Sequence, residues 1–186
     1  MDAYWTPIEA VKSLMVLEDL PKFLWEPACG NGAIVNPLRE AGFNVIASDI
    51  EDYGCELASQ FDYFQTTCTT SCKGIVTNPP FKLALDFAKK ALSEVNYVAL
   101  YLRLNWLEGV RRKPFFQENG PTRVWISSRR LPMMHRHGWE GGKISSSNIA
   151  FAWYIWDNRT FGIGDPDNLP APSATTLRWF DWKEFN

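Results

Sequence analysis

The sequence predicts an α/β fold in which a largely parallel sheet is covered by helices on both faces. Three observations lead to this prediction. Short apolar runs alternate with helical patterns through the first hundred residues, and a glycine turn follows the first run. Two later apolar runs, at residues 124–126 and 149–156, have no clear helix between them. The alternation is typical of parallel strands joined by crossover helices, and the two later runs predict an antiparallel hairpin at one edge.

Each element of the first half rests on a local pattern. The segment Thr6-Pro7-Ile8-Glu9 has the form of a capping box with proline in the first turn, so we expect a helix over residues 7–17. The apolar run at residues 23–26 predicts a strand. Apolar residues then recur on one side of a helix from Ile34 to Ala41, and Gly42 follows as a stop.

The later elements follow in the same way. Strands are expected over residues 45–49 and 74–77, where short apolar runs end in polar residues. A helix over residues 83–92 precedes a strongly apolar strand at 97–102. Residues 52–72 are polar and predict no clear element.

The first strand leads into a glycine turn that is suited to a small ligand. Glu26 is followed by Pro-Ala-Cys and then by Gly30 and Gly32. A strand, a glycine turn and a helix together form the first half of a nucleotide-binding unit, in which a ligand approaches bare backbone. The turn lacks the G-x-G-x-x-G pattern of dinucleotide-binding proteins. Asp49 ends the next strand about 20 residues later, where an acid is the usual partner of ribose hydroxyls, although it could also cap a turn.

The tetrapeptide Asn78-Pro79-Pro80-Phe81 is suited to a specific chemical problem, although Pro-Pro is also an ordinary loop signal. The exocyclic amine of a nucleobase is a poor nucleophile because its lone pair is delocalised into the ring. Two acceptors aimed at the amine hydrogens draw that electron density back to nitrogen, and the Asn78 side-chain oxygen and the Pro79 carbonyl can supply them. The prolines stiffen the backbone, and Phe81 offers a flat face for a base.

In this order and spacing, the glycine turn, Asp49 and the Asn-Pro-Pro-Phe segment resemble the S-adenosylmethionine-dependent N6-adenine DNA methyltransferases. The segments at residues 101–109 and 127–132 are similar to small phage or prophage members of that family. The resemblance covers nearly the whole chain. It implies a Rossmann-like, seven-stranded class I methyltransferase sheet, mostly parallel with an antiparallel edge hairpin, and S-adenosyl-L-methionine as the cofactor.

The resemblance also implies roles for individual residues. The catalytic set would be Asn78, Pro79, Pro80 and Phe81. The methionine part of the cofactor would be held by Glu26, Ala28, Gly30 and Gly32, with Thr6 closing over its carboxylate end. Asp49 would bind the ribose, Ile50 would contact the adenine ring, and Asp62 would accept from the adenine amino group.

Charge is unevenly distributed along the chain, although the net charge is only −2. Basic residues and aromatic residues interleave between residues 103 and 143, whereas the first hundred residues are acidic. Such a block suits phosphates and unstacked bases, although a solvated face with core aromatics would give the same pattern. The expected substrate-binding residues are Arg103, Arg111, Arg112, Arg129, Arg130, Arg136 and Trp139.

Composition limits the remaining possibilities. At 186 residues we expect one methyltransferase domain over residues 1–186, with a small basic recognition segment at about 103–148 inserted within it. No apolar run is long enough for a bilayer and no secretory leader is evident, so we expect a cytoplasmic protein of a bacterial or phage-infected cell, without a membrane partner. The four cysteines are expected to be reduced thiols, and no metal site is expected.

The expected activity is methyl transfer to the N6 amino group of adenine in DNA, with nucleic acid as the partner. About 40 residues lie between the expected core and the last strand, which leaves little room for target recognition, so a homodimer or a recognition partner could contribute to it. Three alternatives stay open. They are an RNA adenine-N6 methyltransferase, a protein glutamine methyltransferase, in which Tyr is more common than Phe at position 81, and a binding module without turnover.

Overall fold

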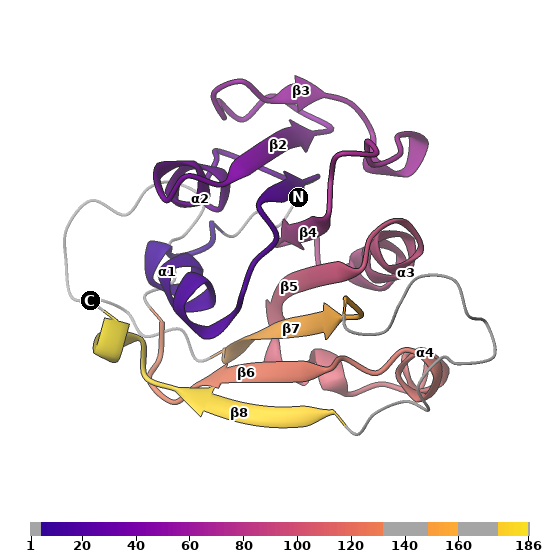
Figure 1. Ribbon diagram of the computed structural model, residues 1–186. Coiled ribbons are helices and arrows are strands. Elements are labelled where there is room, and N and C mark those ends of the chain that lie inside the picture. Colours follow the sequence, from indigo (N-terminus) through magenta and orange to yellow (C-terminus); the bar gives the residue numbers. More distant parts are fainter. Residues whose placement is uncertain (1–4, 132–148, 160–174, 186) are drawn as a thin grey trace.

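The computed structural model describes residues 5–131, 149–159 and 175–185. One sheet of eight strands runs through the molecule in the order β3-β2-β1-β4-β5-β7-β6-β8 (Figure 1). The strands are β1 (Phe23–Glu26), β2 (Asn44–Asp49), β3 (Ser59–Gln60), β4 (Gly74–Thr77), β5 (Tyr97–Arg103), β6 (Arg123–Ser127), β7 (Phe151–Asp157) and β8 (Thr176–Phe180). The helices are α1 (Ile8–Leu17), α2 (Val35–Glu40), α3 (Ala84–Glu94) and α4 (Lys113–Glu118), with 3-10 turns η1 (Tyr63–Gln65), η2 (Leu104–Leu107) and η3 (Trp182–Phe185).

Strands β3, β2, β1, β4 and β5 are parallel, and β7 runs antiparallel to both β5 and β6. The fold class predicted from the sequence is therefore confirmed: a mostly parallel sheet with an antiparallel pair toward one edge. The structure adds an eighth strand, β8, which pairs in parallel with β6 outside the predicted hairpin.

Helices cover both faces of the sheet, as Figure 1 shows, and each face has its own core. Residues Ala10, Val11 and Leu14 of α1 and residues Val35 and Leu38 of α2 belong to one buried cluster. Residues of α3 and α4 belong to the other, on the opposite face. Every residue of β4 is buried, as are six of the seven in β5 and in β7, which explains why these strands are continuous apolar runs in the sequence.

A buried ionic cluster ties the end of α1 to β5 and β6. The Arg123 guanidinium donates to both carboxylate oxygens of Glu18, at 2.8 Å each, and also to Asp157 at 3.1 Å. Trp125 Nε1 and the Tyr97 hydroxyl donate to the same Glu18 carboxylate at 2.6 and 3.3 Å. Glu18 is only 7% exposed, so this charge depends on those donors for its stability.

Across the parts of the chain that the structure describes, every helix is too short or too polar to cross a bilayer.

Candidate active site

The predicted site residues converge because parallel strands end at the same edge of a sheet. Glu26 ends β1 and Asp49 ends β2, while Asn78 directly follows β4 and Arg103 ends β5. These four strands are neighbours in the order β2-β1-β4-β5, so their carboxyl ends line one edge. Ligands of open α/β sheets bind at this edge.

Glu26 is almost completely buried at the start of the glycine turn, with 1% of its surface exposed. One carboxylate oxygen, Oε1, accepts from the Ala28 backbone N–H at 3.0 Å. The other oxygen, Oε2, is buried and has no hydrogen-bond partner among the described residues. Burial raises the pKa of Glu26 to about 8, with a smaller contribution from Asp49 that also raises it, while the nearby Thr77 hydroxyl and the Ala28 N–H oppose the rise.

The glycine turn is shaped by close approach of other groups. Gly30 has φ +53°, and a Cβ atom at this residue would lie 2.5 Å from the ring of Trp5. Gly30 therefore has to be glycine for Trp5 to lie against the turn. The Gly30 N–H donates to Asp49 Oδ2 at 2.8 Å, and the Ile50 N–H donates to Asp49 Oδ1 at 2.8 Å. Oδ1 also accepts from the Glu51 N–H at 3.4 Å. Asp49 thus caps the turn, and Oδ2 can still accept a ligand hydroxyl through its second lone pair.

A hollow of about 230 Å³ lies beside the turn, between residues 29–30, 49–55 and 58–60. Its lining carries the carboxylates of Asp49, Glu51 and Asp52 and contains no Lys or Arg among the described residues. Three acids without a cation would repel a phosphate group and favour a cationic or uncharged ligand. The chemistry of the hollow therefore disfavours a phosphorylated nucleotide.

Asn78 is joined to the segment that precedes α1. Its Nδ2 donates to the Thr6 hydroxyl at 3.1 Å, and Thr6 is only 4% exposed. The capping-box prediction for Thr6 is wrong, because the N-cap residue of α1 is Pro7 and no side chain caps that helix. The backbone after Asn78 turns directly into α3. The Pro80 carbonyl accepts from Leu83 N–H at 2.8 Å, whereas the Pro79 carbonyl makes no hydrogen bond within the described residues.

Phe81 lies half-buried between the two cores and contacts Arg103. The Arg103 guanidinium carbon lies 4.3 Å from the centre of the Phe81 ring, which is a cation–π contact. Phe151 also lies near Phe81, with 6.0 Å between the ring centres. Arg103 and Phe81, predicted for different roles, therefore belong to one cluster.

Of the predicted cofactor residues, Gly30 and Asp49 line the hollow, whereas Thr6, Glu26, Ala28, Gly32, Ile50 and Asp62 do not. Asp62 caps η1, since its carboxylate accepts from the Phe64 N–H at 2.9 Å, and it does not line the hollow. The Ile50 side chain is 51% exposed, directly after Asp49. Their roles toward a ligand stay predictions. Residues that sequence reasoning did not select, such as Tyr53 and Gln60, line the hollow because the loop after β2 folds back to β3.

The predicted substrate-binding arginines differ in how firmly the fold holds them. Arg111 and Arg130 are exposed. Arg112 donates to the carbonyls of Trp106 and Glu108 and so secures the loop after η2. Arg129 forms a two-pronged ion pair with Asp181, which lowers the pKa of that carboxyl. Arg136 and Trp139 lie outside the described residues.

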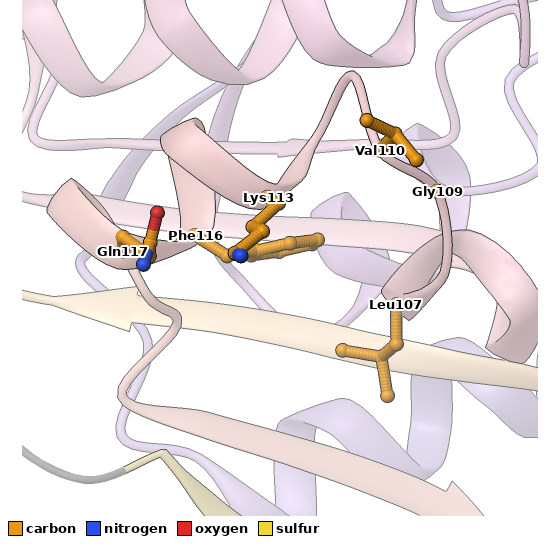
Figure 2. A pocket seen from close by; sticks show the side chains of 6 residues that line it. All are labelled: Leu107, Gly109, Val110, Lys113, Phe116 and Gln117. Carbon is orange, nitrogen blue, oxygen red and sulfur yellow. The ribbon is translucent and has the colours of Figure 1, made fainter.

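A second hollow, of about 440 Å³, opens between η2 and α4 (Figure 2). Leu107 and Val110 line one side of it, while Lys113, Phe116 and Gln117 extend from α4. Val110 is 89% exposed and the neighbouring Arg111 and Lys113 are exposed cations. An open, partly apolar surface with cations beside it follows β5 directly and is separate from the acidic hollow.

No protein-family profile and no curated protein sequence matches the chain. Solved structures match its fold. A proposed RNA methyltransferase from Pyrococcus horikoshii aligns with a TM-score of 0.58 at 15% identity, over 80% of this chain and 82% of that one. A type I restriction-modification system methyltransferase subunit from Streptococcus thermophilus aligns with a TM-score of 0.58 at 14% identity, over 86% and 46%.

A modification subunit of a proposed type I restriction enzyme from Vibrio vulnificus aligns with a TM-score of 0.54 at 15% identity, over 84% of this chain and 44% of that one. The chain thus spans less than half the length of these two restriction-system subunits. At such identities the likeness shows the fold alone, and that fold is one that methyltransferases use.

Proposed function

We propose that the chain transfers a methyl group from S-adenosylmethionine to the N6 amino group of adenine in DNA. One observation carries this proposal. The Asn-Pro-Pro-Phe segment follows the strand next to the glycine turn, so that acceptors for an amine lie on the same sheet edge as an acidic hollow for a cationic ligand. The methyltransferase fold of the structural neighbours supports the same reaction class.

The residues present fit S-adenosylmethionine, which carries a positively charged sulfur and an ammonium group. The Glu26 oxygen without a described partner can accept from that ammonium group. The three carboxylates of the hollow suit a cation, and Asp49 can accept from the ribose hydroxyls. By resemblance, Ala28, Gly30 and Gly32 would hold the methionine part, while Ile50 and Asp62 would meet the adenine ring. When bound, the cofactor supplies an electrophilic methyl group.

The chain contributes alignment and electrostatics to the reaction. Asn78 Oδ1 and the Pro79 carbonyl would accept the two amine hydrogens, which keeps the lone pair on nitrogen rather than in the base ring. The proton that nitrogen loses on methylation passes to water. Phe81 would stack on the target base after the base leaves the duplex stack, and Arg103 would have to shift from the ring face that it covers.

A nucleic acid is favoured as the substrate by the exposed cations of the segment after β5. Arg111 and Lys113 lie next to the apolar Val110, a combination that suits phosphates flanking an unstacked base. A recognition partner or a second copy of the chain would supply the target selectivity that so short a segment lacks.

RNA adenine is the second candidate substrate, and one observation favours it. The proposed RNA methyltransferase from Pyrococcus horikoshii is matched over 82% of its length, whereas the Streptococcus restriction-system subunit is matched over 46%. A glutamine side chain is a weaker candidate, because it would leave the cationic surface without a role.

The test is a substrate panel. Purified protein is incubated with tritiated S-adenosylmethionine and, separately, with duplex DNA, single-stranded DNA, total RNA and protein extract, and the modified unit is identified after digestion. The proposal expects label in N6-methyladenine from DNA. Label confined to RNA or to glutamine would replace the proposed substrate, and no label anywhere would overturn the methyl-transfer activity.

A further inference from the structure

The Thr6 hydroxyl connects the segment before α1 to the amide of Asn78. The two residues are 72 positions apart in sequence, and Asn78 Nδ2 donates to Thr6 Oγ1 at 3.1 Å. Thr6 is 4% exposed, so water has little access to compete for this contact. Because Thr6 is buried, removal of one partner leaves a polar group with little access to water, so the bond is costly to break.

The contact is not a by-product of helix capping. Helix α1 begins at Ile8 with Pro7 as its N-cap residue, and the Ala10 N–H donates to the Pro7 carbonyl at 3.0 Å. Within residues 5–131, 149–159 and 175–185, no side chain caps the N-terminus of this helix. The Thr6 hydroxyl therefore points toward the site rather than toward the orphan N–H groups of α1.

Thr6 is also held firmly from both sides. Before it, the Trp5 ring lies against the glycine turn, because a Cβ atom on Gly30 would come within 2.5 Å of that ring. After it, the buried Pro7 leads into α1. A threonine side chain is stiff about its first torsion because it is β-branched. The hydroxyl oxygen is thus fixed relative to both the glycine turn and β4.

The terminal torsion of an asparagine is soft, so the hydrogen bonds that the Asn78 amide makes decide how it is oriented. The bond to Thr6 places Nδ2 against the hydroxyl. It therefore turns Oδ1, which is bonded to the same carbon, away from Thr6.

We propose that Thr6 is a positioning residue that holds the Asn78 amide with its oxygen directed at the substrate amine. This inference rests on the proposed function, since the amine is that of the target base. Thr6 would not touch the reacting atoms itself. It would act by keeping the acceptor within the narrow range of geometry that alignment requires.

Two variants separate the hydroxyl from the shape of the side chain. Thr6→Val keeps the volume and the branching but removes the hydroxyl, and Thr6→Ser keeps the hydroxyl. We expect Thr6→Val to lower kcat, measured at saturating S-adenosylmethionine because Thr6 is also a predicted cofactor residue, by about tenfold to a hundredfold. We expect Thr6→Ser to recover kcat to within about threefold of the parent.

A second readout needs neither cofactor nor turnover. The side-chain NH₂ signals of Asn78 are identified in ¹⁵N spectra by their loss in Asn78→Ala. Their hydrogen exchange with water should be at least about tenfold faster in Thr6→Val than in the parent, and close to the parent in Thr6→Ser. If Thr6→Val does not fold, as judged by near-ultraviolet circular dichroism, Thr6→Ala takes its place.

Equal kcat and equal exchange in Thr6→Val and the parent would overturn the proposal, as would a Thr6→Ser variant as impaired as Thr6→Val. A parent protein that methylates no amine would instead overturn the proposed function. In that case the exchange comparison would still decide whether Thr6 holds Asn78.

Discussion

At the scale of single residues, the site depends on groups whose environment differs from that of ordinary surface side chains. Glu26 has one oxygen bonded to Ala28 N–H and one without a described partner, and burial raises its pKa to about 8. A carboxyl group that is largely protonated near neutral pH costs little to bury. Its ionised form becomes favourable when a cation lies beside it.

The first prediction concerns stability and pH. Because the folded pKa of Glu26 is raised from 4.5 to about 8, its favourable contribution to stability is complete below pH 4.5 and is lost as pH rises to about 8. Urea unfolding of the parent and of Glu26→Gln at pH 5 to 8 should show the variant gaining stability relative to the parent, by up to about 1.4 kcal/mol per pH unit. The exposed Glu40→Gln is the control, and a pH-independent difference for Glu26→Gln would contradict the prediction.

The second prediction concerns S-adenosylmethionine binding and pH. A cationic ligand beside Glu26 favours the ionised carboxylate, so binding should release a proton below pH 8. The Kd measured by calorimetry should therefore fall as pH rises from 6 to 8 in the parent. Glu26→Gln should bind more weakly and lose this pH dependence. An identical pH dependence in the variant would show that another group is responsible.

At the scale of elements, the sequence predicted the parts of the fold whose burial leaves a clear pattern. Strands β1, β4, β5 and β7 are short apolar runs because they lie within the sheet and are largely or fully buried. Four of the five residues of β8 are exposed, including Leu177 and Trp179, so its apolar residues do not mark a buried strand. Helix α4 has only six residues and includes Pro114, so its sequence is too short to show a helical periodicity of apolar residues.

For the candidate site, the sequence could predict the residues at strand ends but not the contacts between distant segments. Glu26, Asp49 and Asn78 stand at the ends of apolar runs, and parallel strands bring such ends together. The contact between Thr6 and Asn78 joins residues from distant segments, and no local sequence pattern predicts it. Arg112 could not be separated from the other arginines either, because its bonds to two carbonyls depend on the loop geometry.

The third prediction tests how α1 is tied to the sheet. Glu18→Gln keeps the shape of the side chain but removes its negative charge. In the parent, that carboxylate pairs with Arg123 and accepts from Trp125 Nε1. Leaving Arg123 with only Asp157 nearby should lower the free energy of unfolding by about 3 kcal/mol in denaturant titrations. The exposed Glu40→Gln should change it by less than about 0.5 kcal/mol. Equal effects of the two substitutions would contradict a structural role for the buried cluster.

At the scale of the whole molecule, two surface regions of opposite charge follow strands of the parallel sheet. An acidic hollow follows β1 and β2, whereas exposed cations follow β5. This division suits a cationic cofactor on one side and a polyanionic substrate on the other. A local cationic surface of this kind is compatible with the proposed nucleic-acid substrate although the net charge is −2.

The fourth prediction concerns the cationic surface. Arg111→Gln with Lys113→Gln should weaken duplex DNA binding and reduce the slope of log K against log salt concentration by about 1 for each lost phosphate contact. The matched control, Lys12→Gln with Lys89→Gln, removes the same charge from exposed positions of α1 and α3. Equal slopes for the two double variants would mean that only net charge matters.

The measurement that tests the central claim most directly compares Asn78→Ala with Asp49→Ala. Each is scored for S-adenosylmethionine affinity and for N6-methyladenine in DNA, quantified by mass spectrometry of digested nucleosides. We expect Asn78→Ala to lower methylation by at least about a hundredfold while cofactor affinity stays within about threefold, and Asp49→Ala to weaken cofactor binding first. An Asn78→Ala protein that methylates DNA at the parental rate would contradict the account.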